Sequence, residues 1–318
     1  MSKEKILIVG ANGQIGSVLT EALRLHFGNE NVIASDVREP QTSNGIFEHI
    51  DVLNAERIAE IADKYKVTQI YHLAAILSAK GESNPKWAWD INMNGLLNVF
   101  EVARAKGIRK VFYPSSIAVF GNNAPKKNTP QETNLTPNTV YGISKVAGEL
   151  WSEYYHNKYG LDIRSLRYPG VIGYQSDPGG GTTDYAVDIF HYAVRGESYH
   201  CFLKDKTELP MIYMDDAIRA TIELMEAPSQ SISIRTSYNL AGMSFTPSEL
   251  ADSIKSYIPH FEVVFEPDFR QKIADSWPGS VDDSIARRDW HWEPAFDLQK
   301  MTADMILHLK EKYKALTA

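Results

Sequence analysis

Short apolar runs alternate with longer amphipathic segments through the first half of this 318-residue chain. The apolar runs predict strands of a sheet buried on both faces, at Ile6–Val9, Val32–Ala34, Ile70–Leu73, Val111–Tyr113 and Asp162–Arg167. The segments between them predict helices at Gln14–Phe27, Ala55–Tyr65, Trp87–Lys106 and Tyr141–Tyr159. Strict alternation of strand and helix favours an α/β fold, in which a doubly wound parallel sheet has helices on both faces.

The pattern changes after about Gly170. A stretch rich in glycine and proline, Ser176–Thr183, predicts a loop. Helices are expected beyond it at Asp215–Glu226, Pro247–Tyr257 and Leu298–Tyr313. Because cores larger than roughly 250–300 residues tend to divide, we predict two coupled units. The sheet domain spans 1–170 and regains a segment at about 210–240, whereas 171–318 forms mostly a smaller, loop-rich substrate lobe.

Composition narrows the partners and the chemistry. The formal net charge of -7 argues against nucleic acid as a partner, because phosphate binding needs concentrated Lys and Arg. The single cysteine, Cys201, excludes an intramolecular disulfide, and the nine histidines follow no metal-binding spacing, so no metal is expected. No apolar run approaches the roughly 20 residues of a membrane span. The short polar start Met1–Lys5 leads into a strand rather than forming a signal peptide, and we predict a cytoplasmic protein.

A glycine turn follows the first predicted strand. Gly10, Gly13 and Gly16 permit a tight turn and close approach of the backbone to a pyrophosphate at a helix N-terminus, as in Rossmann-type dinucleotide sites. Asp36 lies twenty residues past Gly16, where a carboxylate would bond the adenosine ribose and repel a 2′-phosphate, so NAD is favoured over NADP despite the nearby Arg38. The neighbouring residues expected to touch NAD are Asn12, Gln14, Ile15 and Val37.

Two further segments are candidates for the cofactor site. Asp51-Val52 follows a short apolar run, where Asp51 would hold the adenine edge or, with equal weight, cap the next helix. The small residues of Leu73-Ala74-Ala75 would let backbone approach the middle of the cofactor. The adjacent His72 is expected to be a core histidine with satisfied hydrogen bonds.

Tyr141 and Lys145 carry the expected proton chemistry. Their spacing of four places them on one helical face. A free tyrosine, with a pKa of about 10, is a poor base at neutral pH, but a nearby ammonium lowers that pKa. Such a tyrosine takes a hydroxyl proton while hydride leaves for nicotinamide. Ser116 at the end of the fifth strand would bond the reacting oxygen, with Ser115 as the reserve.

Together these residues resemble the extended short-chain dehydrogenase/reductase family. The resemblance also includes Asn92, the string Ser115-Ser116-Ile-Ala-Val-Phe-Gly121 and Met214-Asp-Asp216, and it spans nearly the whole chain. It implies that Tyr141 is the acid/base, that Lys145 also binds the nicotinamide ribose, and that Ser116 assists. It further implies that Asn92 and Tyr168 lie near the cofactor and that the helix of Asn92 serves a homodimer.

The chain departs from the nucleotide-sugar members of that family. Glu208-Leu209-Pro210 stands where those enzymes carry a diphosphate-gripping Arg-Asp, so a small substrate is implied. One branch, the short-chain threonine dehydrogenases, is more similar, in Leu77–Pro85, Tyr168-Pro-Gly170, Pro178–Tyr185 and Ser276-Trp277-Pro278. That resemblance implies hydride transfer from C3 of L-threonine to NAD, giving 2-amino-3-oxobutanoate.

The same resemblance points to the substrate pocket. Backbone N–H groups of the Gly179–Thr183 loop would receive the threonine carboxylate, and Ser78–Asn84 would be a polar loop that closes as a lid. The expected substrate contacts are Ser78, Ser115, Ser116, Tyr141, Gly180, Thr182, Thr183 and Trp277. Two alternatives stay open: a nucleotide-sugar epimerase or reductase of the same family, and a non-catalytic NAD-sensing protein.

Overall fold

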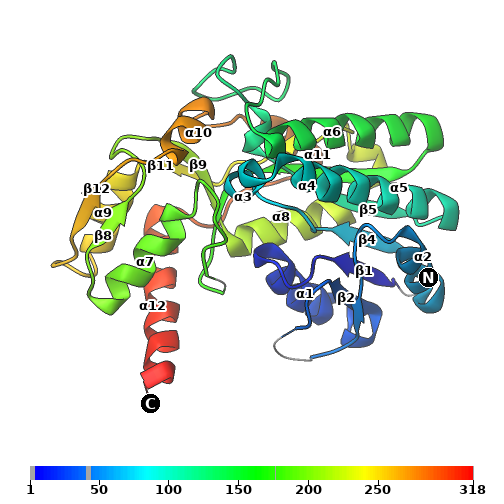
Figure 1. Cartoon of the computed structure of the whole chain (residues 1–318), viewed down its shortest axis with the longest axis horizontal. Helices are drawn as coiled ribbons and strands as arrows, with labels where there is room; N and C mark the ends of the chain where they lie inside the picture. Colours follow the sequence, from blue (N-terminus) through cyan, green and yellow to red (C-terminus); the bar gives the residue numbers. More distant parts are fainter. Residues whose placement is uncertain (1–3, 41–43, 176, 318) are drawn as a thin grey trace.

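The computed structural model describes residues 4–40, 44–175 and 177–317, so Ser176 of the predicted loop lies outside the described residues. Its centre is a seven-stranded sheet with the order β10-β6-β5-β4-β1-β2-β3, in which all neighbouring strands are parallel (Figure 1). The predicted α/β fold with a doubly wound sheet is confirmed. The strands are β1 (Ile6–Val9), β2 (Val32–Asp36), β3 (Phe47–His49), β4 (Gln69–His72), β5 (Lys110–Ser116), β6 (Asp162–Tyr168) and β10 (Tyr238–Asn239).

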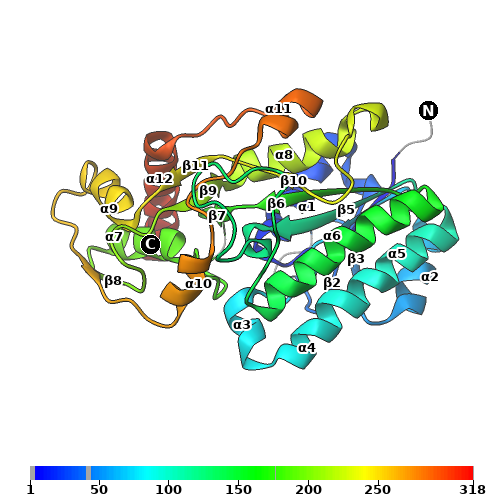
Figure 2. The same ribbon diagram turned by 90° about the horizontal axis from the view of Figure 1, so that it is seen from above.

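Helices cover both faces of this sheet (Figure 2). One face packs on α1 (Gln14–Phe27), α8 (Met214–Glu226) and α11 (Ser284–Trp290). The other face packs on α2 (Ala55–Tyr65), α5 (Gly95–Lys106) and α6 (Val140–Tyr159). The strands are apolar along most of their length because neither face meets water. The strand order reverses direction between β1 and β4, and ligands bind such sheets in the crevice at that point.

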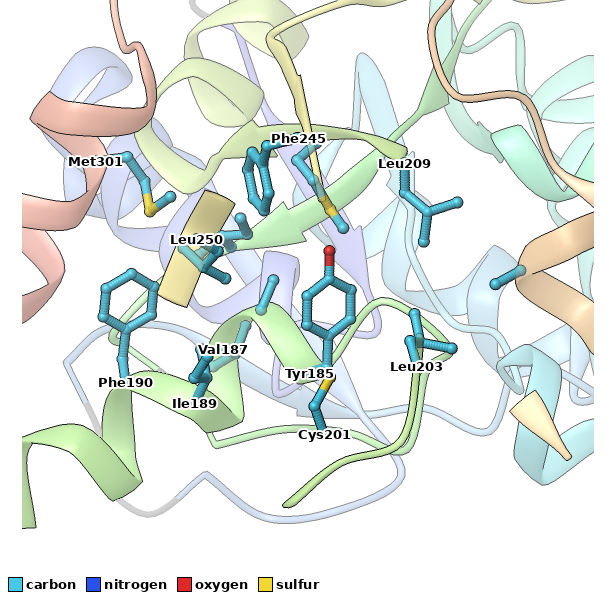
Figure 3. Close-up of a cluster of buried hydrophobic side chains, with 14 of the residues drawn as sticks. Tyr185, Val187, Ile189, Phe190, Cys201, Leu203, Leu209, Phe245, Leu250 and Met301 are labelled. Carbon is cyan, nitrogen blue, oxygen red and sulfur yellow. The ribbon is translucent and has the colours of Figure 1, made fainter. Parts of the chain in front are cut away.

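The later part of the chain forms a second hydrophobic core beside the sheet. Tyr185, Phe190, Leu250 and Met301 meet there, and Figure 3 shows the side chains of this cluster. Its helices are α7 (Tyr185–Arg195), α9 (Pro247–Lys255), α10 (Arg270–Ser276) and α12 (Leu298–Thr317). Its strands form two small sheets, β7 (Gly170–Ile172) with β9 (Leu209–Tyr213) and β11 (Met243–Phe245), and β8 (Tyr199–Cys201) with β12 (Val263–Phe265). β10 is a strand of the large sheet, and α8 packs on one of its faces. Residues after 170 therefore contribute to the sheet domain as well as to the second core. The predicted boundary at 170 stays a prediction.

Two predicted elements differ from the structure. The prediction of a loop at Ser78–Asn84 is wrong, because these residues form the short helix α3 (Ser78–Ser83). This helix buries only Ser78 and Gly81, so its sequence carries no apolar stripe. The expected single helix Trp87–Lys106 is divided into α4 (Pro85–Trp89), a π-helical turn (Asp90–Asn94) and α5. Asn84 starts α4 by accepting a hydrogen bond from the Trp87 N–H at 3.3 Å.

Within the described residues, no helix combines the length and apolar character needed to cross a membrane.

Candidate active site

A cavity of about 220 Å³ lies at the carboxyl ends of β1, β4, β5 and β6. The predicted site residues that line it are Gly10, Gly13, Gln14, Ile15, Gly16, Leu73, Ala75, Ser78, Ser115, Ser116, Tyr141, Lys145, Tyr168, Thr182, Thr183 and Trp277. Leu77, Pro169, Gly170 and Asp184 also line the cavity; they belong to the segments that carry the resemblance but were not predicted as site residues. The structure therefore brings the catalytic, cofactor and substrate candidates into one crevice.

The glycine turn has the shape that a dinucleotide needs. Gly10 has φ +94°, and a Cβ atom on it would lie 2.5 Å from the Ala74 nitrogen, so the fold itself requires glycine there. Gly13 differs, because a Cβ atom on it would meet only the Gly10 oxygen at 3.4 Å. Gly13 precedes α1 without a side-chain cap, and the first turn of this helix borders the cavity. Open space beside an uncapped helix N-terminus suits a pyrophosphate.

Asp36 stands at the edge of the same turn. Its carboxylate accepts the Asn12 N–H at 3.0 Å and the Arg38 N–H at 3.1 Å. The guanidinium Nε of Arg38 lies 3.5 Å from the carboxylate, on a side chain that is 69% exposed. The neighbouring Val37 is also exposed. The residues present thus fit a dinucleotide with a free ribose 2′-hydroxyl.

Several cofactor candidates lie behind the cavity wall instead of lining it. Ala74 contacts Gly10 and donates its N–H to the Val9 oxygen at 3.0 Å. Val52 packs against Gly95 of α5, where an added Cβ atom would lie 2.7 Å from its methyl carbon. Asp51 is exposed and accepts the Leu53 N–H at 2.9 Å.

Asn54, and not Asp51, caps α2, by accepting the Arg57 N–H at 2.9 Å. The alternative in which Asp51 caps that helix is therefore wrong, and its contact with adenine stays a prediction.

Asn92 links three elements. Its amide oxygen accepts the Ile76 N–H at 2.7 Å, and its amide nitrogen donates to the Ile76 oxygen at 3.1 Å and to the Ser144 hydroxyl at 3.3 Å. It thereby fixes the chain after β4 to α6 from within the π-helical turn. In this geometry Asn92 supports the cavity wall and does not line it.

His72 is buried next to this wall and stacks on Tyr113 with ring centres 6.4 Å apart. Its Nδ1 has no hydrogen-bond partner among the described residues, so the expectation of a satisfied core histidine is wrong for that atom. Burial, aided by Lys145, lowers the pKa of His72 to about 3, and the ring is neutral.

The helix α6 places the catalytic candidates. Thr139 starts it by accepting the Gly142 N–H at 3.0 Å, which fixes the first turn where Tyr141 lies. The Lys145 nitrogen lies 5.3 Å from the centre of the Tyr141 ring and donates a hydrogen bond to the Pro114 oxygen at 2.6 Å. Ser116, whose hydroxyl accepts the Ala118 N–H at 3.2 Å, lies beside the Tyr141 hydroxyl and favours its ionised form.

The electrostatics of this pair differ from the expectation. Burial raises the pKa of Tyr141 to about 12, although the hydrogen bond from Ser116 opposes the rise. Burial also lowers the pKa of Lys145 to about 7, although the Glu149 carboxylate opposes the fall. The expected net lowering of the tyrosine pKa is therefore wrong in this geometry, because loss of solvation disfavours both charged forms and outweighs the groups that favour the phenolate.

Two candidates turn their hydroxyl groups away from the cavity. Ser115 donates to Glu149 at 2.5 Å, on the sheet face that α6 covers. The Tyr168 hydroxyl bonds Thr221 of α8 on the opposite face. Both residues line the cavity, but these hydroxyl groups already have partners. The choice of Ser116 over Ser115 as the polar contact is the one that this geometry favours.

The loop before α7 closes the other side of the cavity. The Asp184 carboxylate accepts the Gly180 and Gly181 N–H groups, each at 2.7 Å. Those two N–H groups were expected to receive a substrate carboxylate; in the structure Asp184 holds them. Gly180 itself does not line the cavity.

Unpartnered polar atoms remain around this end of the cavity. The Thr182 hydroxyl and the Trp277 indole nitrogen are buried and have no hydrogen-bond partner among the described residues. Thr183 packs against Gly170, and Ser78 begins α3 with only 4% of its surface exposed. A small polar ligand would satisfy the buried donors that this wall presents.

Comparisons with known proteins agree with these features. Residues 6–241 match the family described as NAD dependent epimerase/dehydratase family. The chain is 47% identical over 308 residues to mitochondrial L-threonine 3-dehydrogenase of Bos taurus, covering 96% of this chain and 82% of that protein.

Two solved structures are similar throughout. One is the holo form of a GalE-like L-threonine dehydrogenase from Cupriavidus necator, with 55% identity, TM-score 0.95 and coverage of 96% of this chain and 100% of that one. The other is the apo form of a monomeric L-threonine 3-dehydrogenase from a metagenome, with 48% identity, TM-score 0.94 and coverage of 96% and 99%.

Proposed function

This chain belongs to the NAD dependent epimerase/dehydratase family, and on that premise we propose that it oxidises L-threonine at C3 with NAD, giving 2-amino-3-oxobutanoate. One observation carries the proposal: Tyr141 and Ser116 share a cavity of about 220 Å³ with Thr182, Trp277 and Asp184. The same cavity is lined by the glycine turn, so it would receive part of NAD together with the substrate.

The cofactor and the proton chemistry share the crevice, since hydride transfer needs the reacting carbon beside both the nicotinamide and Tyr141. NAD supplies the hydride acceptor. The residues that would hold it are the glycine turn from Gly10 to Gly16, Asp36, and the wall at Leu73–Ala75. Tyr141 takes the proton of the C3 hydroxyl, Ser116 holds the same oxygen, and the Lys145 ammonium favours the phenolate.

The wall at Asp184 orients the amino acid. Threonine is a zwitterion, and Asp184 supplies a carboxylate for its ammonium group. The Thr182 hydroxyl and the Trp277 N–H are buried donors that suit its carboxylate. Ser78 at the start of α3 also lines the cavity and would complete the polar contacts.

We also propose that two copies pair through α4 and α6. Large apolar side chains are exposed on these neighbouring helices: Trp87, Trp89, Ile143, Leu150, Trp151 and Tyr154. Such a patch is typical of protein interfaces. Light scattering on the purified protein checks this, since one similar enzyme is described as monomeric. A cytoplasmic location stays a prediction from the sequence.

The direct test mixes the purified protein with NAD and L-threonine and follows the absorbance of NADH. NADP, D-threonine and L-serine run in parallel, and UDP-glucose and UDP-galactose test the epimerase alternative. We expect NADH with L-threonine and NAD. Tight NAD binding without threonine oxidation would contradict the assignment of threonine as the substrate. Conversion of a nucleotide sugar would replace threonine with that sugar as the assigned substrate.

A further inference from the structure

Three consecutive residues at the end of β5 lie against three residues of α6, and two of these pairs are hydrogen-bonded. The Pro114 oxygen accepts from Lys145 at 2.6 Å, and the Ser115 hydroxyl donates to Glu149 at 2.5 Å. Ser116, the third residue, lies beside Tyr141 and favours its phenolate. The helix residues are spaced by four, so they share one helical face. The catalytic candidates and Glu149 are thus joined to the same strand end.

Glu149 is the innermost of these helix residues. Only 1% of its surface is exposed, and it forms a two-pronged ion pair with Arg167 at 2.9 and 2.7 Å. Arg167 lies opposite Ser115 on β6, which is the neighbouring strand. Its guanidinium also donates to the Gln131 oxygen at 2.9 Å and to the Asn239 amide oxygen at 3.1 Å. Glu149 is therefore held by β5, β6 and β10 together.

Stability alone does not account for a buried ion pair at this place. Apolar side chains of similar volume often serve as well or better, because the charges lose their hydration. The pair lies one helical turn from Lys145, behind the strand end that carries Ser116. A role in the geometry and charge of the active site accounts for both its identity and its position.

We propose that Glu149 is a positioning residue: through Ser115 and Arg167 it fixes the end of β5 against α6, and its charge holds the Lys145 ammonium beside Tyr141. This inference rests on the proposed function and deepens it. Glu149 does not line the cavity and touches neither substrate nor cofactor in this role.

The groups around Lys145 leave Glu149 to oppose the cost of burying a cation. Tyr141 on α6 and Tyr113 on β5 are neutral because burial raises the pKa of both phenols. His72 on β4 is neutral because burial lowers its pKa. Arg167 on β6 is a cation, but its guanidinium faces Glu149. Asp184 also borders the cavity.

The sign of the expected effect follows from these charges. Glu149→Gln removes a negative charge and leaves the Arg167 cation without its partner, so Lys145 releases its proton at lower pH. Tyr141, with a pKa of about 12, stays protonated through this range, so its own titration does not move. The limb of the threonine-oxidation pH profile that follows Lys145 therefore moves to lower pH.

The experiment compares wild type, Glu149→Gln and Glu153→Gln, a control one turn further along α6 on an exposed residue. For Glu149→Gln we expect kcat about tenfold lower, as for other supporting residues. The KM values for threonine and NAD should stay near wild type, and the limb of the pH profile of kcat that follows Lys145 should move to lower pH by about one unit. Glu153→Gln should match wild type throughout.

A second readout needs no substrate. Acetylation of Lys145 in the protein alone, followed by peptide mass spectrometry over a pH series, reports its protonation. We expect the labelling curve of Glu149→Gln to move to lower pH. Unchanged labelling and an unchanged pH profile would leave only a structural role and overturn the proposal. If wild type fails to oxidise threonine, the proposed function fails, and the labelling still decides the role of Glu149.

Ser115→Ala covers the case in which Glu149→Gln does not fold. It keeps the ion pair with Arg167 and removes only the link to β5. We expect a lower kcat at unchanged KM for threonine. A raised KM for threonine with unchanged kcat would mean that Ser115 binds substrate. That result would overturn the proposal that Ser115 connects Glu149 to β5.

Discussion

The carbonyl oxygen of Gly10 occupies the place where Gly16 would carry a side chain: a Cβ atom on Gly16 would lie 2.2 Å from it. Gly10 and Gly16 are therefore glycines that the fold requires. Gly13 is not, since an added Cβ atom would make only an ordinary contact at 3.4 Å. Gly10 and Gly16 are thus needed for folding, whereas Gly13 is the glycine that leaves room for a ligand.

Gly13→Ala should weaken NAD binding while the protein stays folded. The methyl group would enter the space beside the N-terminus of α1, where a pyrophosphate would approach. We expect an NAD Kd at least about tenfold higher, or roughly 1.4 kcal/mol, by titration calorimetry. Gly16→Ala is the matched comparison and should lower stability by about 1–3 kcal/mol through overpacking. Unchanged NAD affinity in Gly13→Ala would contradict the placement of the cofactor.

Tyr141→Phe should remove most of the turnover and keep the cofactor. It deletes only the hydroxyl that exchanges a proton with substrate, so kcat should fall by about 100- to 10,000-fold. NADH affinity, followed by fluorescence, should be unchanged. Tyr159→Phe at the other end of α6 is the control and should behave as wild type. Retained turnover in Tyr141→Phe would refute its assignment as the acid/base.

Lys145→Met should abolish activity and yet stabilise the protein near neutral pH. Burial lowers the pKa of Lys145 to about 7, well below its usual value of 10.5. Below pH 7 both folded and unfolded chains carry the ammonium, and the folded state bears the full cost of burying it. Between pH 7 and 10.5 the unfolded chain binds more protons, so stability rises with pH and the cost disappears above 10.5.

The measurement is chemical denaturation of both proteins over that pH range. We expect Lys145→Met to be more stable by about 1 kcal/mol at pH 7, with the difference shrinking as the pH approaches 10. A difference that stays constant with pH would show that Lys145 is not the group responsible.

Asp184→Asn should impair threonine binding without disordering its loop. The amide oxygen can still accept the Gly180 and Gly181 N–H groups, but the charge for the substrate ammonium is lost. We expect the KM for threonine to rise about tenfold or more, with NAD affinity unchanged. Steady-state kinetics at several NAD concentrations, in assays started without NADH, separates the KM for threonine from the affinity for NAD. An unchanged KM would leave Asp184 as a loop residue only.

Periodicity predicted the large helices and the sheet because their patterns are long. The bounds of α1 and α2 agree with the prediction at both ends. Short elements were missed because they hold too few residues for a pattern to appear: α3 buries two residues, and β7 is three residues long. The π-helical turn before α5 leaves no mark on the apolar spacing that the prediction used.

The site was predictable where residue type and strand ends coincide. Ser116 and the glycine turn lie at the carboxyl ends of β5 and β1, and Tyr141 and Lys145 lie in the first turns of α6 beside them. Asp184 was missed because its partners, two backbone N–H groups of its own loop, are set by a loop conformation. The engagement of Ser115 with Glu149 was likewise hidden, since it depends on which face of β5 each serine takes.

The π-helical turn Asp90–Asn94 restricts how this segment can change length. Each residue of an α-helix turns the chain by about 100°, and a π turn accommodates one extra residue. Deleting a residue here would restore a regular helix and rotate α4 about its axis relative to α5. The apolar patch of Trp87 and Trp89 would then point elsewhere, or Asn92 would lose Ile76. In this part of the chain, the spacing between residues is under tighter constraint than most of their identities.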